Sequence, residues 1–251
     1  MTAQRPLLYV GFAQPDEWGN WAGTYARHAA RFEECAGRPC LTVSFLQADT
    51  DLVRRLEPSA IVLSGFARSF EQYAPASLEA VCSMVLDVTN VPMLAVCGSH
   101  QLLGYLYNGE LEGGAQPVDR PMRLRKPGEP ALNPHYHPDY FMEIGFHELD
   151  LHGCDPLFAT CGAPPAVCES HYCEIKRLPP GFRLLASTPE CRIQAMRHEE
   201  RPLVGVQFHP EDWTDRFPDG RAVLQAFFAQ GPAAPDAECT SSTSRKERTN
   251  A

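Results

Sequence analysis

Short apolar runs alternate with amphipathic helical patterns along the first hundred residues, and this alternation constrains the fold more than any other feature of the chain. Apolar runs of this kind are typical of strands buried on both faces, and helices between them are typical of parallel crossover connections. The predicted strands cover residues 7–12, 41–46, 60–63 and 91–96, and the predicted helices cover residues 25–34, 51–56, 78–86 and 99–107. We therefore expect an α/β domain with a central, mostly parallel sheet flanked by helices.

The second half of the chain is less regular. Six prolines between Gln116 and Tyr140 exclude long helices or strands from that segment. Beyond it, strands are predicted at residues 143–149, 167–169, 183–187, 193–197 and 204–208, some of them antiparallel, and a last helix at 221–229. We expect residues 1–230 to form one domain. Residues 231–251 have no helix or strand period and are predicted to be a disordered tail.

Charge and cysteine usage exclude several classes of protein. The formal net charge is −9, and nucleic-acid binding needs clustered Lys and Arg that this sequence lacks. The first apolar run, residues 7–12, is too short for a secretion signal or a membrane span. The ten cysteines are scattered, and we expect reduced thiols in a cytoplasmic protein that contacts neither membrane nor nucleic acid.

The clearest chemical signal is Cys97, which stands where the fourth predicted strand turns into a helix. This is the pattern of a nucleophile elbow, which requires small residues two positions to either side, here Ala95 and Ser99. The helix N-terminus favours a thiolate, and the amide of Gly98 would lie beside an oxyanion. A buried core cysteine is the alternative.

A possible base follows the last predicted strand. His209 precedes Pro210, which favours extended backbone, and side chains two residues apart then point to one side. Glu211 is therefore expected to reach His209, fix its tautomer and stabilise its charge. The alternative is a histidine with a purely structural role at a strand end.

The two segments together resemble class I glutamine amidotransferases. Members of that family typically carry a Gly-x-Cys-x-Gly-His-Gln elbow and a Gln-Phe-His-Pro-Glu segment. Residues 95–101 read Ala-Val-Cys-Gly-Ser-His-Gln, and residues 207–211 match the second motif in full. The stretch from Glu169-Ser-His-Tyr to Ile193-Gln-Ala-Met also resembles the glutaminase domain of GMP synthetase. The similarity covers most of residues 41–228.

The resemblance implies a flavodoxin-like fold with Cys97, His209 and Glu211 as a catalytic triad. It implies hydrolysis of the glutamine side-chain amide, without a cofactor, and delivery of ammonia to a separate synthetase. It further implies that Gln101 and the backbone around Ser170, His171 and Tyr172 hold the α-groups of the substrate. His100 is expected to be structural, because His209 already fills the role of the base.

One departure from the family pattern concerns the oxyanion loop. The family typically reads Ser-Gly-Gly-Pro, whereas this chain reads Ser64-Gly65-Phe66-Ala67. The residue that offers its amide falls on Phe66, which does not readily adopt the positive φ that glycine permits. Either Phe66 in a remodelled loop or Gly65 would then be the donor. Two alternative functions stay open: a stand-alone γ-glutamyl hydrolase or peptidase, and a catalytically silent regulatory protein of the same fold.

No metal site is expected from the sequence. His135 and His137 lie in the proline-rich segment, without a cysteine or carboxylate at ligand spacing in a rigid element. Four cysteines of the second half lack the close pairs of a zinc site and are expected to be packing thiols: Cys154, Cys161, Cys168 and Cys173.

Overall fold

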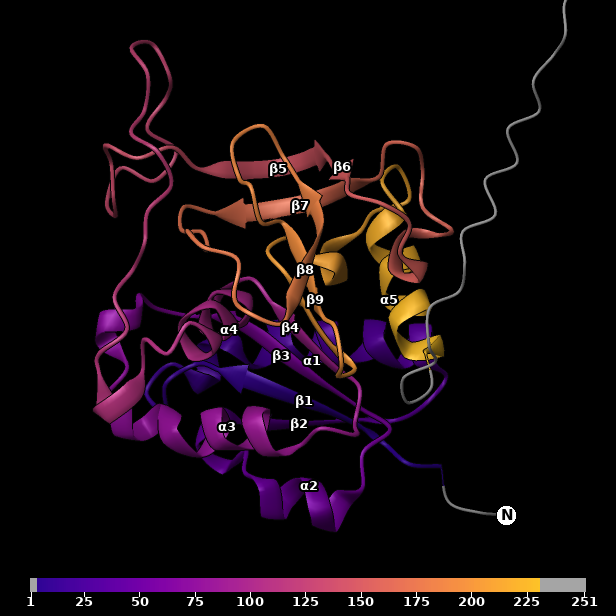
Figure 1. Cartoon of the computed structure of the whole chain (residues 1–251). Helices are drawn as coiled ribbons and strands as arrows, with labels where there is room; N and C mark the ends of the chain where they lie inside the picture. Colours follow the sequence, from indigo (N-terminus) through magenta and orange to yellow (C-terminus); the bar gives the residue numbers. More distant parts are fainter. Residues whose placement is uncertain (1–3, 231–251) are drawn as a thin grey trace, which may run out of the picture.

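Two sheets organise the computed structural model, which describes residues 4–230 (Figure 1). The strands of the larger sheet are β1 (Leu7–Phe12), β2 (Cys40–Ser44), β3 (Ala60–Phe66), β4 (Met93–Val96), β6 (Asp150–Leu151), β8 (Phe182–Ser187), β9 (Ala195–His198) and β10 (Leu203–Val206). Their order is β2-β1-β3-β4-β10-β9-β8-β6, parallel from β2 to β10 and antiparallel from β10 to β6. β5 (Glu143–Glu148) and β7 (Ala166–His171) form a separate antiparallel pair. The expected fold class is confirmed.

Helices cover both faces of the large sheet because its strands are apolar on both sides. The helices are α1 (Trp18–Ala36), α2 (Thr50–Leu56), α3 (Pro75–Asp87), α4 (Gly98–Tyr107) and α5 (Asp219–Ala229). Leu8 and Val10 of β1 pack into the core cluster that contains residues of α2, α3 and α4. Leu7 and Tyr9 pack on the opposite face, in the cluster that contains residues of α1 and α5. Successive side chains of a strand point to opposite faces, so a continuous apolar run supplies two cores.

Several observed boundaries differ from the predicted ones, and two of the differences shape the site. β3 continues to Phe66 instead of ending at Leu63, because Phe66 extends the pairing with Phe12 of β1. β10 ends at Val206, two residues earlier than predicted. In the second half, β9 begins at Ala195 rather than at residue 193, and the two-residue strand β6 was not predicted.

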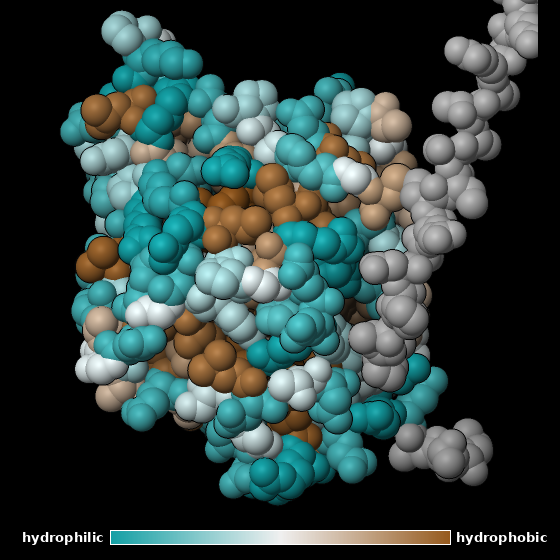
Figure 2. Space-filling model, viewed as in Figure 1, coloured by the Kyte–Doolittle hydropathy of each residue, from teal (hydrophilic) through white to brown (hydrophobic). Residues whose placement is uncertain are grey.

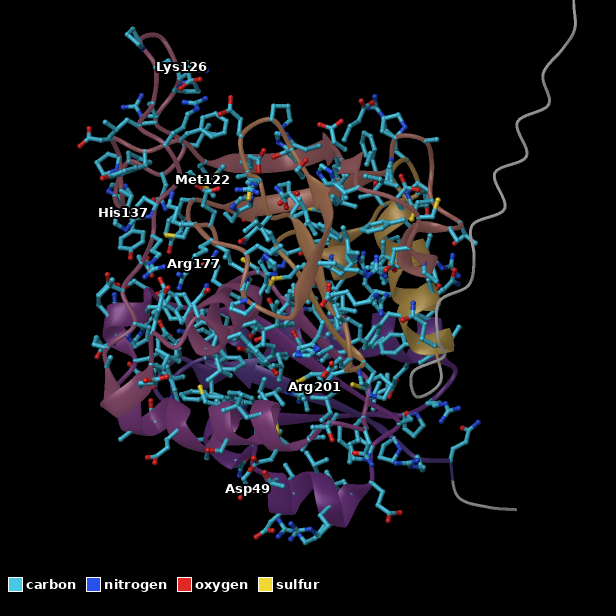
Figure 3. All side chains as sticks on the ribbon, in the orientation of Figure 1. Asp49, Met122, Lys126, His137, Arg177 and Arg201 are labelled. Atoms are coloured by element: carbon cyan, nitrogen blue, oxygen red, sulfur yellow. The ribbon has the colours of Figure 1, made fainter. Side chains whose placement is uncertain are left out.

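The proline-rich segment 116–140 contains no helix or extended strand and projects from one corner of the molecule (Figure 1). Figure 3 places Lys126 toward its tip, with Met122 and His137 nearer its base. Isolated bridges join Leu124 to Tyr140 and Pro121 to Cys173. The segment is therefore a folded projection that is attached to the chain just after β7.

Two further observations concern the polarity of the surface and the hydropathy of the helices. Hydrophilic residues dominate the face shown in Figure 2, and the hydrophobic residues on it form separate small patches. Among residues 4–230, no helix combines the length and the hydropathy needed to cross a bilayer. The predicted tail, residues 231–251, lies outside the described residues.

Candidate active site

Cys97 lies at a sharp turn between β4 and α4, as the sequence predicts. Its backbone has φ 52° and ψ −110°, a combination that L-residues rarely adopt and that is typical of strained functional turns. The turn can be this tight because Ala95 and Ser99 are small; both are fully buried, and the Ser99 hydroxyl donates to the carbonyl of Ser64 on β3. The amide of Cys97 donates to the Val206 carbonyl on β10 at 2.8 Å. Neighbouring strands therefore hold the elbow in place.

The side chains of Cys97 and His209 converge next to Gly65. A Cβ atom built on Gly65 would lie 3.3 Å from Cε1 of His209 and 3.8 Å from Sγ of Cys97. The three residues come from the carboxyl ends of β3, β4 and β10, where ligand sites of parallel sheets assemble. Gly65 leaves the space in which the thiol and the imidazole meet.

His209 and Glu211 form a close pair. His209 Nδ1 lies 2.9 Å from Glu211 Oε1, and the Glu211 side chain is only 2% exposed. The predicted contact is present, but the reason given for it is wrong. Residues 210–212 form a 3₁₀ turn, so the turn, and not an extended segment, brings Glu211 back to His209. The His209 amide also donates to the Cys168 carbonyl on β7 at 2.8 Å, which fixes the backbone of the turn.

The electrostatics of the pair favour a protonated imidazole. Burial alone would lower the pKa of His209, but the adjacent Cys97 and the Glu211 carboxylate raise that pKa well above its usual value. Burial would likewise raise the pKa of Glu211, and the charge of His209 instead lowers it. The site can therefore hold an imidazolium between a sulfur nucleophile and a carboxylate.

Further polar groups from α1 surround Glu211. His28 Nδ1 lies 3.0 Å from the Tyr9 hydroxyl and 3.8 Å from Glu211 Oε1, and Arg31 donates to the Glu211 carbonyl. No residue of α1 was predicted to lie at the site. These contacts are made across the fold and leave no local sequence pattern.

Phe66 ends β3, just after an irregularity in the pairing of β3 with β1, and lies directly against the elbow. Neither Phe66 nor Gly65 has a positive φ, and a Cβ on Gly98 would lie 2.7 Å from the Phe66 backbone nitrogen. The ring of Phe66 stacks on Phe12, with centroids 4.4 Å apart, and packs at 4.6 Å from the Phe70 ring. The large side chain is accommodated by this aromatic cluster. The Phe66 and Gly98 amides are thereby brought close together without a glycine at position 66.

A small pocket of about 80 Å³ opens beside Cys97. Of the residues predicted to bind the substrate, all four line it: Gln101, Ser170, His171 and Tyr172. The amide nitrogen of Gln101 is engaged within the protein, because it donates to the Cys173 carbonyl at 2.9 Å and to Gln207 Oε1 at 3.1 Å. The imidazole of His171 is buried among carboxylates on β5 and β7.

Among the residues at the pocket or the thiol that were not predicted to lie there, two are charged and one is an amide. Asp119 and Arg68 line the pocket and supply one charge of each sign. Gln207 Nε2 lies 3.7 Å from Cys97 Sγ. Gln207 belongs to the Gln-Phe-His-Pro-Glu motif and could have been noticed there. Asp119 lies in the proline-rich segment, and no periodicity marks it.

The remaining histidine predictions have clear structural outcomes. His100 is fully buried, its Nε2 lies 2.9 Å from the Ile193 carbonyl, and burial lowers its pKa to about 3, which fits the structural role predicted for it. His137 lies 3.7 Å from Asp119, whereas His135 is exposed.

The predicted packing thiols differ from one another in burial. Cys173 is buried, and Cys161 and Cys168 are partly buried. Cys154 is exposed, so the prediction that it packs in the interior is wrong. It follows a glycine in the irregular connection after β6, where the chain runs along the surface.

A cysteine at a strained strand-to-helix turn, beside a histidine–glutamate pair at the ends of parallel strands, is typical of hydrolases with a cysteine nucleophile. The family model described as "Glutamine amidotransferase class-I" matches residues 31–230. The chain belongs to the class I glutamine amidotransferase family.

Individual relatives support the same assignment. A subunit of the glutamine-hydrolyzing GMP synthase of Pyrococcus abyssi is 32% identical over 162 residues, which are 63% of this chain and 69% of that relative. A protein from Thermoplasma acidophilum, described as a GMP synthase subunit, has a similar structure, with a TM-score of 0.63 and 22% identity over 90% of this chain and 93% of that one. The glutaminase domain of a Trypanosoma brucei CTPS with bound acivicin has a TM-score of 0.61 and 14% identity over 92% and 96% of the two chains. These two structures show a shared fold.

Proposed function

We propose that the chain hydrolyses the side-chain amide of glutamine through Cys97, His209 and Glu211, and that it supplies the ammonia to a separate synthetase. The observation that carries the proposal is the convergence of the Cys97 and His209 side chains beside Gly65, with Glu211 Oε1 2.9 Å from His209. The names of the relatives support glutamine as the substrate and hydrolysis as the reaction, because these relatives are subunits of glutamine-hydrolyzing GMP synthases.

The proposed mechanism uses groups of this chain only. His209 accepts the thiol proton of Cys97, the sulfur attacks the amide carbon, and the amides of Phe66 and Gly98 stabilise the oxyanion. The tetrahedral intermediate collapses, the C–N bond breaks, and His209 donates its proton to the departing ammonia. Water, deprotonated by His209, then cleaves the thioester and releases glutamate. Glu211 holds His209 in one orientation throughout.

The pocket supports an amino-acid substrate. Its volume of about 80 Å³ suits a narrow side chain, and Asp119 and Arg68 lie at the same pocket. The Asp119 carboxylate is complementary to the ammonium of a zwitterion, and the Arg68 guanidinium, which also pairs with Asp16 and Glu17, is complementary to its carboxylate. Gln101 and the backbone of residues 170–172 complete the proposed binding surface.

Selective labelling tests the assignment of the nucleophile. A diazo-ketone analogue of glutamine should alkylate Cys97 and no other cysteine, because among residues 4–230 Cys97 alone combines a place at the pocket with a neighbouring imidazole, and burial raises the pKa of Cys173, which also lines the pocket. Peptide mass mapping locates the label, Cys97→Ala should lose it, and Cys154→Ser, which changes the exposed cysteine, should keep it. A label on another cysteine would contradict the assignment.

One observation favours a second candidate, a γ-glutamyl hydrolase or peptidase. The segment 116–140 contributes Asp119 to the pocket, and the ring of Tyr136 lies 5.0 Å from the ring of Tyr172. A projection at the pocket could contact a leaving group larger than ammonia. Binding energy from such a group would then be available to the transition state.

Steady-state kinetics separate the candidates. An ammonia-supplying protein should have low glutaminase activity alone and higher activity when a synthetase and its substrates are added, because the partner orders the site. A γ-glutamyl hydrolase should cleave γ-glutamyl peptides alone, with a higher kcat/KM than for glutamine. Fast partner-free peptide cleavage with negligible glutaminase activity would reject the first proposal. No turnover of either substrate, with Cys97 unlabelled, would identify a catalytically silent protein.

A further inference from the structure

A second group of reactive side chains lies behind the pocket, and the proposed hydrolysis does not use it. Four side chains from three separate segments meet there: Glu143 at the start of β5, Glu169 and His171 on β7, and Cys191 between β8 and β9. All four are buried, with exposed fractions of 2% or less. Ligand atoms of Glu143, His171 and Cys191 lie within 4.8 Å of one another.

The charges of this cluster are not balanced by basic side chains. His171 Nε2 lies 2.9 Å from Glu143 Oε2 and 3.2 Å from Glu169 Oε2. Within residues 4–230, neither carboxylate has a Lys or Arg nitrogen within 4.0 Å. One imidazolium compensates only one of two carboxylates, and an uncompensated buried charge is strongly unfavourable.

Glu169 is the least satisfied member of the cluster. It is completely buried, and neither of its carboxylate oxygens has a hydrogen-bond partner among the described residues. Glu143, by contrast, accepts from the Thr188 hydroxyl and from Gln194 Nε2, each at 2.7 Å. A buried carboxylate directed at a histidine but without a hydrogen bond requires a cation or a proton at that point.

The orientation of His171 is the one that a metal ligand requires. Its Nδ1 lies 2.9 Å from the Cys173 carbonyl, so Nδ1 carries the proton. Without a metal, Nε2 carries a proton and hydrogen-bonds to Glu143 Oε2, and the two carboxylates raise the pKa of His171 to about 10 against the effect of burial; a bound metal ion would take the place of that proton. A backbone carbonyl on one ring nitrogen and carboxylates facing the other is the usual environment of a metal-binding histidine. Thr188 and Gln194 would hold the Glu143 ligand in place in the same way.

We propose that Glu143, His171 and Cys191, with Glu169 moving in from its position beside His171 as the fourth ligand, bind a divalent first-row transition-metal ion, Zn²⁺ by the choice of ligands. One imidazole, two carboxylates and one thiolate form a four-ligand set that is typical of zinc. Metal bonds of about 2.0–2.2 Å at angles near 90–110° place the nitrogen and oxygen ligands roughly 3 Å apart, which matches the 2.9 and 3.2 Å between His171 and the carboxylates. Binding releases the thiol proton of Cys191.

The position of the cluster indicates a structural role for the ion. β5 and β7 form a sheet of their own, and Cys191 belongs to the connection between two strands of the large sheet. An ion held by both would join the two sheets. β7 also carries Ser170 to the pocket, and its Cys168 carbonyl accepts the His209 amide. The ion would therefore fix the strand that holds the pocket and the base.

Metal content tests the proposal without reference to amide hydrolysis. The full chain, purified without a metal-binding tag and dialysed, should contain zinc stoichiometric with protein by elemental analysis. Glu169→Gln and Cys191→Ser should lose most of this zinc. The matched controls are Glu148→Gln, an exposed residue of β5, and Cys154→Ser, an exposed cysteine, and both should retain it.

A spectroscopic measurement keeps the test decisive if a variant folds poorly. Wild-type protein stripped with a chelator and loaded with Co²⁺ should show a thiolate-to-cobalt absorption band in the near ultraviolet. The band should persist in Cys97→Ser and disappear in Cys191→Ser. Re-addition of Zn²⁺ to stripped wild-type protein should raise its melting temperature.

The proposal would be overturned if wild-type protein had no stoichiometric metal, no absorption band and no shift in melting temperature. The cluster would then be held together by hydrogen bonds and protons alone. Glutamine hydrolysis could still proceed in that case, so failure of one proposal does not imply failure of the other.

Discussion

Glu211 acts through His209 in the proposed mechanism, and this arrangement predicts a graded effect of substitution. Glu211→Gln should keep the fold and lower kcat by about 10²–10⁴-fold, because His209 loses its orienting charge. Cys97→Ala should remove turnover completely, since no covalent intermediate can form. Kinetics together with melting temperature check both variants. Equal and complete loss of activity in two well-folded variants would give Glu211 a more direct role.

The same substitution should also change the titration of His209. The Glu211 carboxylate contributes to raising the pKa of this imidazole above its usual value, so Glu211→Gln should lower it. The imidazolium should then deprotonate at a lower pH than in the wild-type protein. Titration of the histidine ring protons by NMR measures the direction of the change, and an unchanged or higher pKa would contradict the assigned pairing.

Gly98 is required by the close approach of β3 to the elbow. A methyl group at this position would lie 2.7 Å from the Phe66 nitrogen and 2.8 Å from its Cβ, so the strand would have to move. Gly98→Ala should therefore displace one proposed oxyanion donor and lower kcat by about 10²–10³-fold. Gly23→Ala is the control, because a Cβ there meets nothing within 4 Å. Similar kcat values for the two variants would place the oxyanion site elsewhere.

At the scale of secondary structure, Asp155 fastens the turn after β6 to the large sheet. Its carboxylate binds the guanidinium of Arg197 at 2.8 Å and pairs with Arg183, and it accepts from the Leu157 amide. Burial would raise the pKa of Asp155, but Arg197 and the other partners lower it below its usual value. The stabilisation is therefore present at neutral pH and is lost as the pH falls through the lowered pKa of the folded state.

Asp155→Asn should consequently destabilise the protein in a pH-dependent manner. At pH 7 the free energy of unfolding should fall by about 1.5–3 kcal/mol, the range for hydrogen bonds to charged groups. The difference from the wild type should shrink as the pH drops, because the wild-type carboxyl then becomes protonated. Urea unfolding at a series of pH values checks this. A difference independent of pH would show that the charge of Asp155 is not responsible.

The elements of the first half were predictable because their signals are local. β1 and α2 have the predicted positions within one residue, since each is a short periodic segment between clear breaks. The second half was less predictable because its pairings are antiparallel and non-local. Nothing in residues 143–149 or 167–169 indicates that β5 and β7 leave the main sheet and pair with each other.

The same distinction applies to the candidate site. Cys97, His209 and Glu211 lie in two contiguous motifs, so the sequence alone could bring them together. Asp119 reaches the pocket from an irregular segment. The cluster of Glu143, Glu169, His171 and Cys191 depends on contacts between residues up to 48 positions apart. Only tertiary structure reveals such groups, and the sequence-based expectation of no metal site did not consider them.

On the scale of the whole molecule, the segment 116–140 is the part that connects the surface projection to the pocket. Asp119 accepts from the Phe70 amide at 2.8 Å and from the Tyr136 hydroxyl, so both ends of the segment meet at this carboxylate. Arg123 ties the projection to the body of the protein through Glu190 and pairs with Glu129 within the projection itself. A less ordered projection should therefore change the position of Asp119 and thereby weaken substrate binding.

Arg123→Met tests this connection, because it keeps a long apolar side chain and removes the charge pairs together with the guanidinium that lies over the Phe141 ring. The bond after Arg125 should become several-fold more susceptible to trypsin, whereas the bonds after Arg120 and Lys126 precede proline and stay resistant. The pairs are partly exposed, so the free energy of unfolding should change by about 1 kcal/mol or less.

KM of the Arg123→Met variant for glutamine should rise with little change in kcat, since Asp119 loses its fixed position while the triad does not. Arg54→Met, which breaks the exposed pair with Asp51 on α2, should leave KM and the cleavage pattern unchanged. Unaltered KM in Arg123→Met, with the projection cleaved rapidly, would show that the pocket does not depend on the order of the segment.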